Sequence, residues 1–290
     1  MGSGGRCRGG GETKPNGNCS NPGRDGLVVQ CVGAWAREKH DYVRRYIEAT
    51  HGARQKYLAP KGRRPAGGAA YIELFAGPGG ARIRTSGEII DGSPLIGARH
   101  TVAPFTRLIF ADKEPENIEA LNARLKALSR PADTFCGDCN DMIDQIVRRI
   151  PPHGLNLALV DPYGLAPLSF ETVGKLAAVK RMDMIIHFPT MDVKRNFANA
   201  EAFITRFLGT DTWKSRVTRP QDAVRLIIVL YEQLAHFGYT RDHVRVAEIK
   251  TKGHVLYHLV FATKVPLGNK IWQSIVRTDA KGQRTLPGID

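Results

Sequence analysis

Apolar positions along the chain cluster in short runs that have the length and composition of buried strands. These runs lie at residues 71–76, 107–111, 134–136, 155–160 and 182–188. Helical patterns are predicted between them, at residues 94–100, 115–128, 141–150 and 169–179. Strands that alternate with helices in this way are typical of a parallel sheet covered by helices on both faces.

The C-terminal part departs from this alternation. A long helix is predicted over residues 220–237, and two strands at 244–250 and 255–263 predict a β-hairpin. Residues 190–219 fit no strand and are interpreted as an insertion or helical cap. We therefore predict an α/β fold with a Rossmann-like, doubly wound sheet of seven strands, mostly parallel with a C-terminal antiparallel hairpin.

The N-terminus offers little apolar surface. Residues 1–26 are rich in Gly, Asn, Ser and Pro, so they are predicted to be a disordered tail that cannot offset the entropy of ordering. Residues 28–57 show one helical pattern within a basic segment, 27–66, and residues 27–290 are predicted to form one domain. The five cysteines are odd in number and indicate no disulfide framework. Cys136 and Cys139 lack a second pair of ligands, so no metal site is expected.

Composition and charge narrow the function. With 290 residues, 42% of them hydrophobic, the chain can bury one large core. It has no apolar run of the roughly 18 residues that span a bilayer and no signal-peptide core, so we expect a cytoplasmic protein without a membrane partner. The formal net charge of +14 favours nucleic acid as a partner, RNA over DNA.

The densest basic stretch lies between residues 37 and 64. Its candidate phosphate contacts are Arg44, Arg45, Arg63 and Arg64. The alternative, a helix face whose charges are merely solvated, is equally compatible with the pattern.

The turn after the first predicted strand has the chemistry of a nucleotide-like cofactor site. Glycine lets a backbone approach a ligand closely. A dinucleotide fingerprint would place Arg82 at its last position, where close helix packing suffers, so hydride chemistry is not favoured. The turn resembles motif I of S-adenosylmethionine methyltransferases, and its candidate cofactor residues are Glu73, Phe75, Gly77, Pro78, Gly79 and Gly80.

Two acidic residues follow the next two predicted strands. Asp112 stands where a doubly wound fold holds ribose hydroxyls. Asp138 has the position of an adenine partner in methyltransferases, although an N-cap for the helix after it is the alternative.

The strand at 155–160 ends in a second candidate centre, the loop Asp161, Pro162, Tyr163 and Gly164. This loop resembles a shortened form of the (D/N)-P-P-(Y/F/W) motif of amino-methyltransferases, with one proline missing. The resemblance implies that Asp161 and Pro162 hold an amine while Tyr163 stacks on a base. His187 is interpreted as a structural residue at a strand end and is left out of the chemistry.

Taken together, these segments resemble the three-Cys-motif partner (TcmP) family. The matching pieces span residues 71–272 and are LFAGPGG, GEIIDGSPLIGA, FADKEPENIEAL, DPYGL, HLVFATK and GNKIW. The resemblance implies a methyltransferase-like Rossmann fold and, as a partner, a radical-SAM-like protein that bears the three cysteines.

The sequence thus favours an S-adenosylmethionine-dependent methyltransferase that acts on a base nitrogen of RNA, less readily of DNA. Two alternatives stay open: a non-catalytic partner protein that keeps the cofactor fold, and a methyltransferase for a small molecule.

Overall fold

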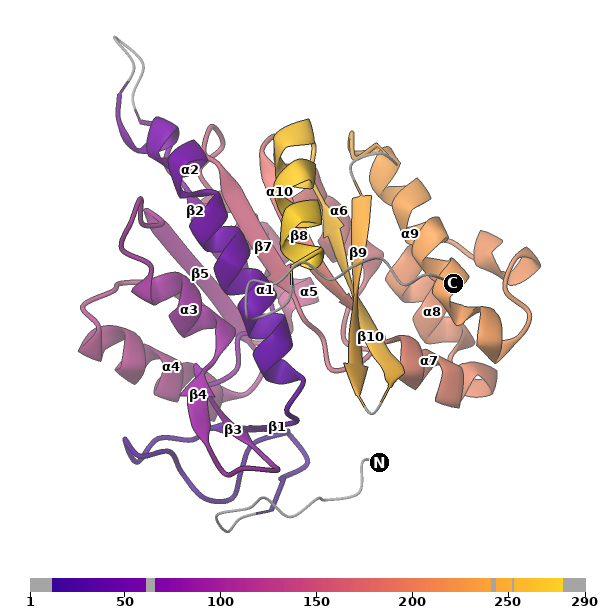
Figure 1. The fold of residues 1–290 in the computed structure, drawn as a ribbon, viewed down its shortest axis with the longest axis horizontal. Coiled ribbons are helices and arrows are strands. Elements are labelled where there is room, and N and C mark those ends of the chain that lie inside the picture. Colours follow the sequence, from indigo (N-terminus) through magenta and orange to yellow (C-terminus); the bar gives the residue numbers. More distant parts are fainter. Residues whose placement is uncertain (1–11, 61–65, 241–243, 252, 279–290) are drawn as a thin grey trace.

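The computed structural model describes residues 12–60, 66–240, 244–251 and 253–278, and Arg63 and Arg64 lie outside them. Its centre is a seven-stranded sheet with the order β6-β5-β2-β7-β8-β10-β9 (Figure 1). The strands are β2 (Ala70–Glu73), β5 (Arg107–Asp112), β6 (Asp133–Cys136), β7 (Asn156–Val160), β8 (Met182–Phe188), β9 (Val244–Thr251) and β10 (His254–Ala262). The first five strands in this order pair in parallel, and β10 runs antiparallel to β8 and β9. The predicted fold class is confirmed.

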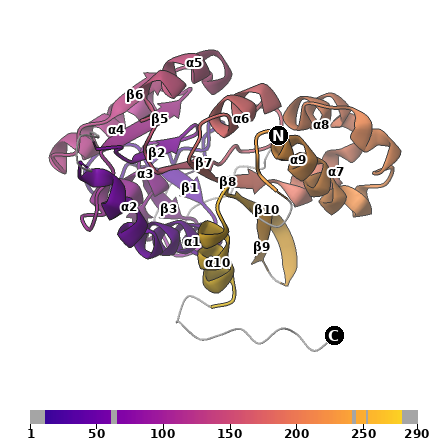
Figure 2. The same ribbon diagram turned by 90° about the horizontal axis from the view of Figure 1, so that it is seen from above.

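Helices cover both faces of this sheet (Figure 2). Each face has its own hydrophobic core. One face is packed by α1 (Ala36–Ala49), α3 (Ser93–Arg99), α4 (Pro115–Ala127) and α10 (Pro266–Val276). The other is packed by α5 (Cys139–Arg149), α6 (Phe170–Ala177), α8 (Glu201–Leu208) and α9 (Leu226–Ala235). Neighbouring residues of a strand point to opposite faces, so Tyr71 joins the first core and Ile72 the second. This double coverage explains why the strands read as continuous apolar runs.

A second, three-stranded sheet lies beside the start of α1, at the lower left of Figure 1. It consists of β1 (Gln30–Val32), β3 (Gly80–Ile83) and β4 (Ile89–Asp91). The single helix expected over residues 28–57 is therefore wrong at its start, because β1 pairs with β3 before α1 begins. After α1 the chain continues as a separate helix, α2 (His51–Leu58).

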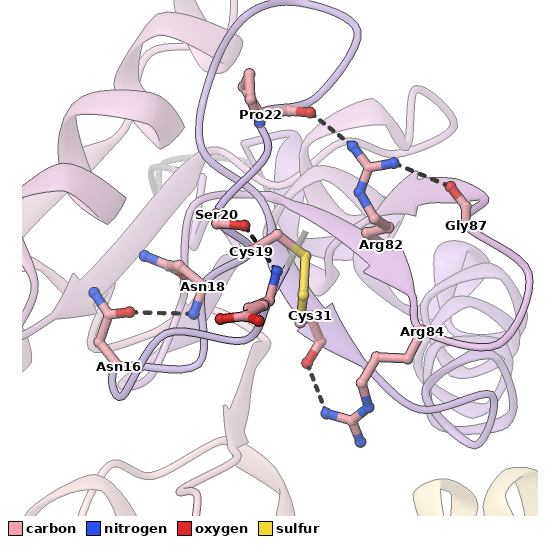
Figure 3. The surroundings of a disulfide bond; sticks show 10 residues. Asn16, Asn18, Cys19, Ser20, Pro22, Cys31, Arg82, Arg84 and Gly87 are labelled. Carbon is pink, nitrogen blue, oxygen red and sulfur yellow. Dashed lines mark hydrogen bonds between the residues drawn. A yellow bond between two sulfur atoms is a disulfide. The ribbon is translucent and has the colours of Figure 1, made fainter. Parts of the chain in front are cut away.

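The prediction of a disordered tail is wrong for residues 12–26. Together with residues 27–33 they form a loop, here called the N-terminal loop, which is closed by a disulfide between Cys19 and Cys31 (Figure 3). Asn18 is fully buried, and its side-chain amide donates hydrogen bonds of 2.8 Å to the side chains of Glu116 and Asn117 in α4. A covalent link and hydrogen bonds to α4 thus replace the apolar burial that the composition cannot supply.

Arg124 of α4 also binds the N-terminal loop. Its guanidinium pairs with Asp25 at 2.8 Å and donates to the carbonyl oxygen of Val28 at 2.9 Å. Residues 1–11, the rest of the predicted tail, lie outside the described part of the chain.

The segment 190–219 is mostly helical and packs against the face of α9. It contains α7 (Thr190–Asn196), the 3₁₀ turns η1 (Phe197–Asn199) and η2 (Thr212–Ser215), and α8. The helix expected at 220–237 is divided into the 3₁₀ turn η3 (Pro220–Arg225) and α9, and α10 was not predicted. Within the described residues, no helix is long and apolar enough to cross a membrane.

The packing of α3 on β2 gives a stability prediction. A Cβ atom added at Gly97 would lie 2.3 Å from Cδ1 of the buried Tyr71, whereas nothing lies within 4 Å of one added at Gly52 in α2. We expect Gly97→Ala to lower the free energy of unfolding by about 1–3 kcal/mol, because the ring must move in a filled core. Gly52→Ala should leave it unchanged or raise it by up to about 1 kcal/mol. Urea unfolding of both variants measures this, and equal losses would refute the close approach.

Candidate functional site

A cavity of about 340 Å³ opens where β2, β7 and β8 end, between α1 and the hairpin. Loops at the carboxyl edge of a parallel sheet are where ligands bind in doubly wound folds. Of the residues predicted from the sequence, the cavity is lined by Phe75, Gly79, Gly80, Asp161, Pro162 and Tyr163. The glycine turn and the DPYG loop, 80 residues apart in the chain, therefore meet at one site, as the sequence predicted.

Glu73 lies one layer behind the cavity wall. It is 1% exposed, and its Oε2 accepts a hydrogen bond of 2.7 Å from the Ser93 hydroxyl. Burial raises the pKa of Glu73 to about 8, so the side chain is mostly protonated at neutral pH. Ser93 lines the cavity and Glu73 does not, so Glu73 acts on the site only through its hydrogen bond with Ser93.

This raised pKa makes stability fall with rising pH. An acid whose pKa is higher in the folded state binds more protons there, so folding loses free energy as pH rises from about 4.5 to about 8. Glu73→Gln keeps a neutral hydrogen-bonding group and removes that loss. We expect the variant to gain stability over the parent chain progressively between pH 5 and pH 8, measured by urea unfolding. A constant difference across this range would contradict the assignment.

Asp112 ends β5 as predicted, but its carboxylate is occupied by neighbouring groups of the chain. Its Oδ2 accepts from the Gly77 amide at 2.7 Å, and its Oδ1 accepts from the Glu114 amide and the Asn117 side chain, each at 2.9 Å. Asp112 thereby holds Gly77 in its left-handed conformation, φ +63°.

Neither Asp112 nor Asp138 lines the cavity. The Asp138 side chain accepts from the amide of Asn140 at 2.8 Å and caps α5, which is the alternative considered from the sequence. Gly77 and Pro78 do not line it either.

The N-terminal loop lies against both the glycine turn and the DPYG loop. A Cβ at Gly77 would lie 2.5 Å from Nε2 of Gln30, and one at Gly17 would lie 3.1 Å from the Tyr163 hydroxyl. Gln30 also donates a hydrogen bond to that hydroxyl.

This arrangement fits only part of S-adenosylmethionine. Gly79, Gly80 and Asp161 face open volume that suits its methionine part. If Asp112 were to bind the ribose, as predicted from the sequence, its carboxylate would have to give up hydrogen bonds within the chain, and Gln30 would have to leave Gly77. The adenosine part fits only if the N-terminal loop moves.

The DPYG loop meets a partner that the sequence analysis missed. Lys39 of α1 forms an ion pair with Oδ2 of Asp161, and both side chains are mostly buried. Burial is the largest influence on the pKa of Asp161 and would raise it, but the charge and hydrogen bond of Lys39, together with His187 and His40, outweigh burial and hold this pKa below its usual value. Asp161 is therefore a carboxylate at neutral pH.

Further polar residues that were not predicted also line the cavity, among them His40 of α1, His187 of β8 and Tyr257 of β10. The ring of His187 interacts with the backbone of Pro162, which agrees with a structural role, but the residue also lines the cavity and its Nδ1 has no hydrogen-bond partner. Burial lowers the pKa of His187 to about 4 and that of His40 to about 3, so both imidazoles are neutral at pH 7. Sequence signals for them were weak because none of the three belongs to a recognisable motif, and they come from three different elements.

Of the predicted basic contacts, Arg44 and Arg45 lie in the described part of the chain, and neither lines the cavity. Arg44 pairs with Asp41 and, at 2.9 Å, with Glu48. Arg45 pairs with Asp41 at 2.7 Å and donates to the carbonyl oxygens of Ile275 and Thr278, both at 2.9 Å. Arg45 thus ties α1 to α10, which contradicts its role as a free phosphate contact. Two other cations, Arg84 and Arg195, line the cavity instead.

No protein-family model and no curated protein matches this chain. Among solved structures, it is similar to TYW2 of M. jannaschii in complex with AdoMet, with 10% identity, 86% of each chain covered and a TM-score of 0.41. It is also similar to cofactor-bound Rv0187 from MTB, with 10% identity, coverage of 80% of this chain and 81% of that one, and a TM-score of 0.44. A third is the magnesium protoporphyrin IX methyltransferase of Synechocystis PCC 6803 with bound SAH, with 10% identity, coverage of 79% and 85%, and a TM-score of 0.37.

Proposed function

We propose that this chain is an S-adenosylmethionine-dependent methyltransferase whose substrate is a base nitrogen of RNA. The observation that carries the proposal is the meeting of the glycine turn after β2 with the ionised Asp161 after β7 in one cavity at the carboxyl edge of the sheet. The excess of 14 positive charges and the cations Arg84 and Arg195 at the cavity favour a polyanionic substrate.

Within this proposal, S-adenosylmethionine supplies the methyl group and the chain orients the acceptor. Asp161 accepts a hydrogen bond from the target nitrogen and so directs the lone pair of that nitrogen into the cavity. Tyr163, which is 62% exposed, offers a ring for stacking on the base. Lys39 keeps Asp161 charged, and the missing second proline is compatible with this arrangement.

A second function is favoured by one specific observation. The carboxylate of Asp112 is already bonded to Gly77 and Asn117, and the N-terminal loop covers it. A non-catalytic protein that uses the cofactor fold to bind a partner needs no open ribose site. The resemblance to the TcmP family makes a radical-SAM-like protein with three cysteines the proposed partner in that case.

The deciding experiment is transfer of tritiated methyl groups from S-adenosylmethionine into total RNA, DNA and protein fractions and into a small-molecule extract. It is run with and without a thiol reductant, because the N-terminal loop is closed by a disulfide. Label in RNA that is lost with Asp161→Ala supports the proposed enzyme. Absence of label under both conditions refutes it and leaves the partner function.

A further inference from the structure

Two of the residues that line the cavity each carry a buried polar atom without a hydrogen-bond partner. Nδ1 of His187 and the hydroxyl of Tyr257 are both buried and have no hydrogen-bond partner, although both residues line the cavity. Their rings are adjacent, with centroids 4.3 Å apart in an edge-on arrangement. An unsatisfied buried donor or acceptor costs about 1–3 kcal/mol, so a pair of them beside a cavity points to a ligand that completes them.

Charge limits what that ligand is. His187 and His40 are neutral at pH 7, and the charges of Lys39 and Asp161 cancel in their ion pair. A further charge placed against His187 and Tyr257 would find no counter-charge among these four groups, which is costly in a buried place. The group that reaches His187 and Tyr257 is therefore uncharged and carries hydrogen-bonding atoms.

The walls limit its shape. Aromatic side chains of Trp35, Phe75 and Tyr163 line the same cavity, and Arg84 lies over the ring of Trp35 at 5.4 Å. Aromatic walls with a few polar atoms at one end are typical of sites for planar heteroaromatic rings. An uncharged ring with donors and acceptors along its edge satisfies both conditions.

We propose that His187 and Tyr257 are recognition residues that read the edge of an uncharged nucleobase inserted between the aromatic walls. The hydroxyl of Tyr257 can donate or accept, and Nδ1 of neutral His187 does either according to its tautomer, so the pair can match an amino or a carbonyl edge. This inference rests on the proposed function for its substrate class, but it concerns binding and not methyl transfer.

The test uses Tyr257→Phe, which removes one oxygen atom and keeps the ring beside His187. Its matched control is Tyr231→Phe in α9, whose hydroxyl is also buried without a partner but does not line the cavity. The probes are four single-stranded RNA hexamers, each of one base, and an abasic hexamer of the same length. Binding is measured by fluorescence anisotropy at low salt, and stability by urea unfolding.

We expect the parent chain to bind at least one base-containing hexamer more tightly than the abasic one. Tyr257→Phe should weaken that binding about three- to tenfold, the effect of one lost hydrogen bond, without lowering stability. Tyr231→Phe should bind like the parent chain. His187→Gln is expected to change the order of preference among the four bases.

Two outcomes would overturn the inference, and a third would separate it from the proposed function. If the parent chain binds abasic and base-containing hexamers equally well, or binds no hexamer, a nucleobase is not the ligand of this site. A loss of stability in Tyr257→Phe would show that the hydroxyl has a structural partner. If base-dependent binding requires Tyr257 while no methyl group is transferred, the recognition site stands and the proposed enzymatic function fails.

Discussion

Reduction of the disulfide between Cys19 and Cys31 is expected to raise the affinity for S-adenosylmethionine by about tenfold or more, equivalent to about 1.4 kcal/mol. In the closed arrangement, Gln30 lies against Gly77, whose amide Asp112 holds, and donates a hydrogen bond to the hydroxyl of Tyr163. A cofactor that binds only when this loop has moved has its apparent affinity reduced by the fraction of open molecules. Cutting the covalent link increases that fraction, because the link restricts the conformations of the opened loop.

Calorimetry with S-adenosylhomocysteine on the oxidised protein, the reduced protein and the Cys19→Ser/Cys31→Ser variant measures the effect. Cys136→Ser, which changes an exposed free thiol of β6, is the control for unrelated effects of reductant and should respond to reduction like the parent chain. Gln30→Ala should raise the affinity of the oxidised protein as well, since it removes the contact with Gly77. Equal or lower affinity after reduction would show that the loop does not compete with the cofactor.

Replacing Asp161 by Ala should lower turnover by about 100-fold or more while cofactor affinity changes little. The carboxylate aligns the acceptor nitrogen during methyl transfer, so its loss falls on the transition state. Single-turnover methylation on the substrate identified by the tritium screen measures this. Tyr163→Ala should weaken substrate binding as well, and Tyr163→Phe should be mild because stacking needs only the ring.

The variant needs two controls, because Asp161→Ala also leaves Lys39 buried without its counter-ion. Lys39→Met combined with Asp161→Leu removes both charges and should recover stability without recovering turnover. Asp192→Asn changes another acid at the cavity and should keep turnover within about twofold, since this side chain is exposed and bonds Asn196. Full activity of Asp161→Ala would remove the DPYG loop from the chemistry.

Local sequence patterns specified the central sheet closely. The apolar run at 182–188 became β8 with the same bounds, and Asp112 is the last residue of β5. Such strands are buried on both faces, so their extent follows from their own composition. The glycine turn and the DPYG loop were located for the same reason, because parallel strands bring their carboxyl ends to one edge.

Contacts between distant segments were decided by the tertiary structure alone. Lys39 meets Asp161 across 122 residues, and His187 meets Tyr257 across a strand pair. The charges of Arg44 and Arg45 identified a basic helix, but only packing shows that Arg45 is engaged with α10. A side chain's charge is a local property, whereas its partner depends on which elements the fold places beside it.

The N-terminal loop shows most clearly what local composition determines and what contacts with distant residues determine. Its composition correctly indicates a segment that cannot bury enough apolar surface to order itself, since only Cys19, Val29 and Cys31 form its small apolar cluster. Its order in residues 12–33 comes instead from a disulfide and from hydrogen bonds to Glu116, Asn117 and Arg124, which lie about 100 residues further along the chain. The sequence by itself determined the sheet, the glycine turn and the acids that end its strands, because these follow from local burial and backbone geometry. The tertiary structure decided which of these acids face the cavity and which are covered, because that depends on where a polar loop finds its partners.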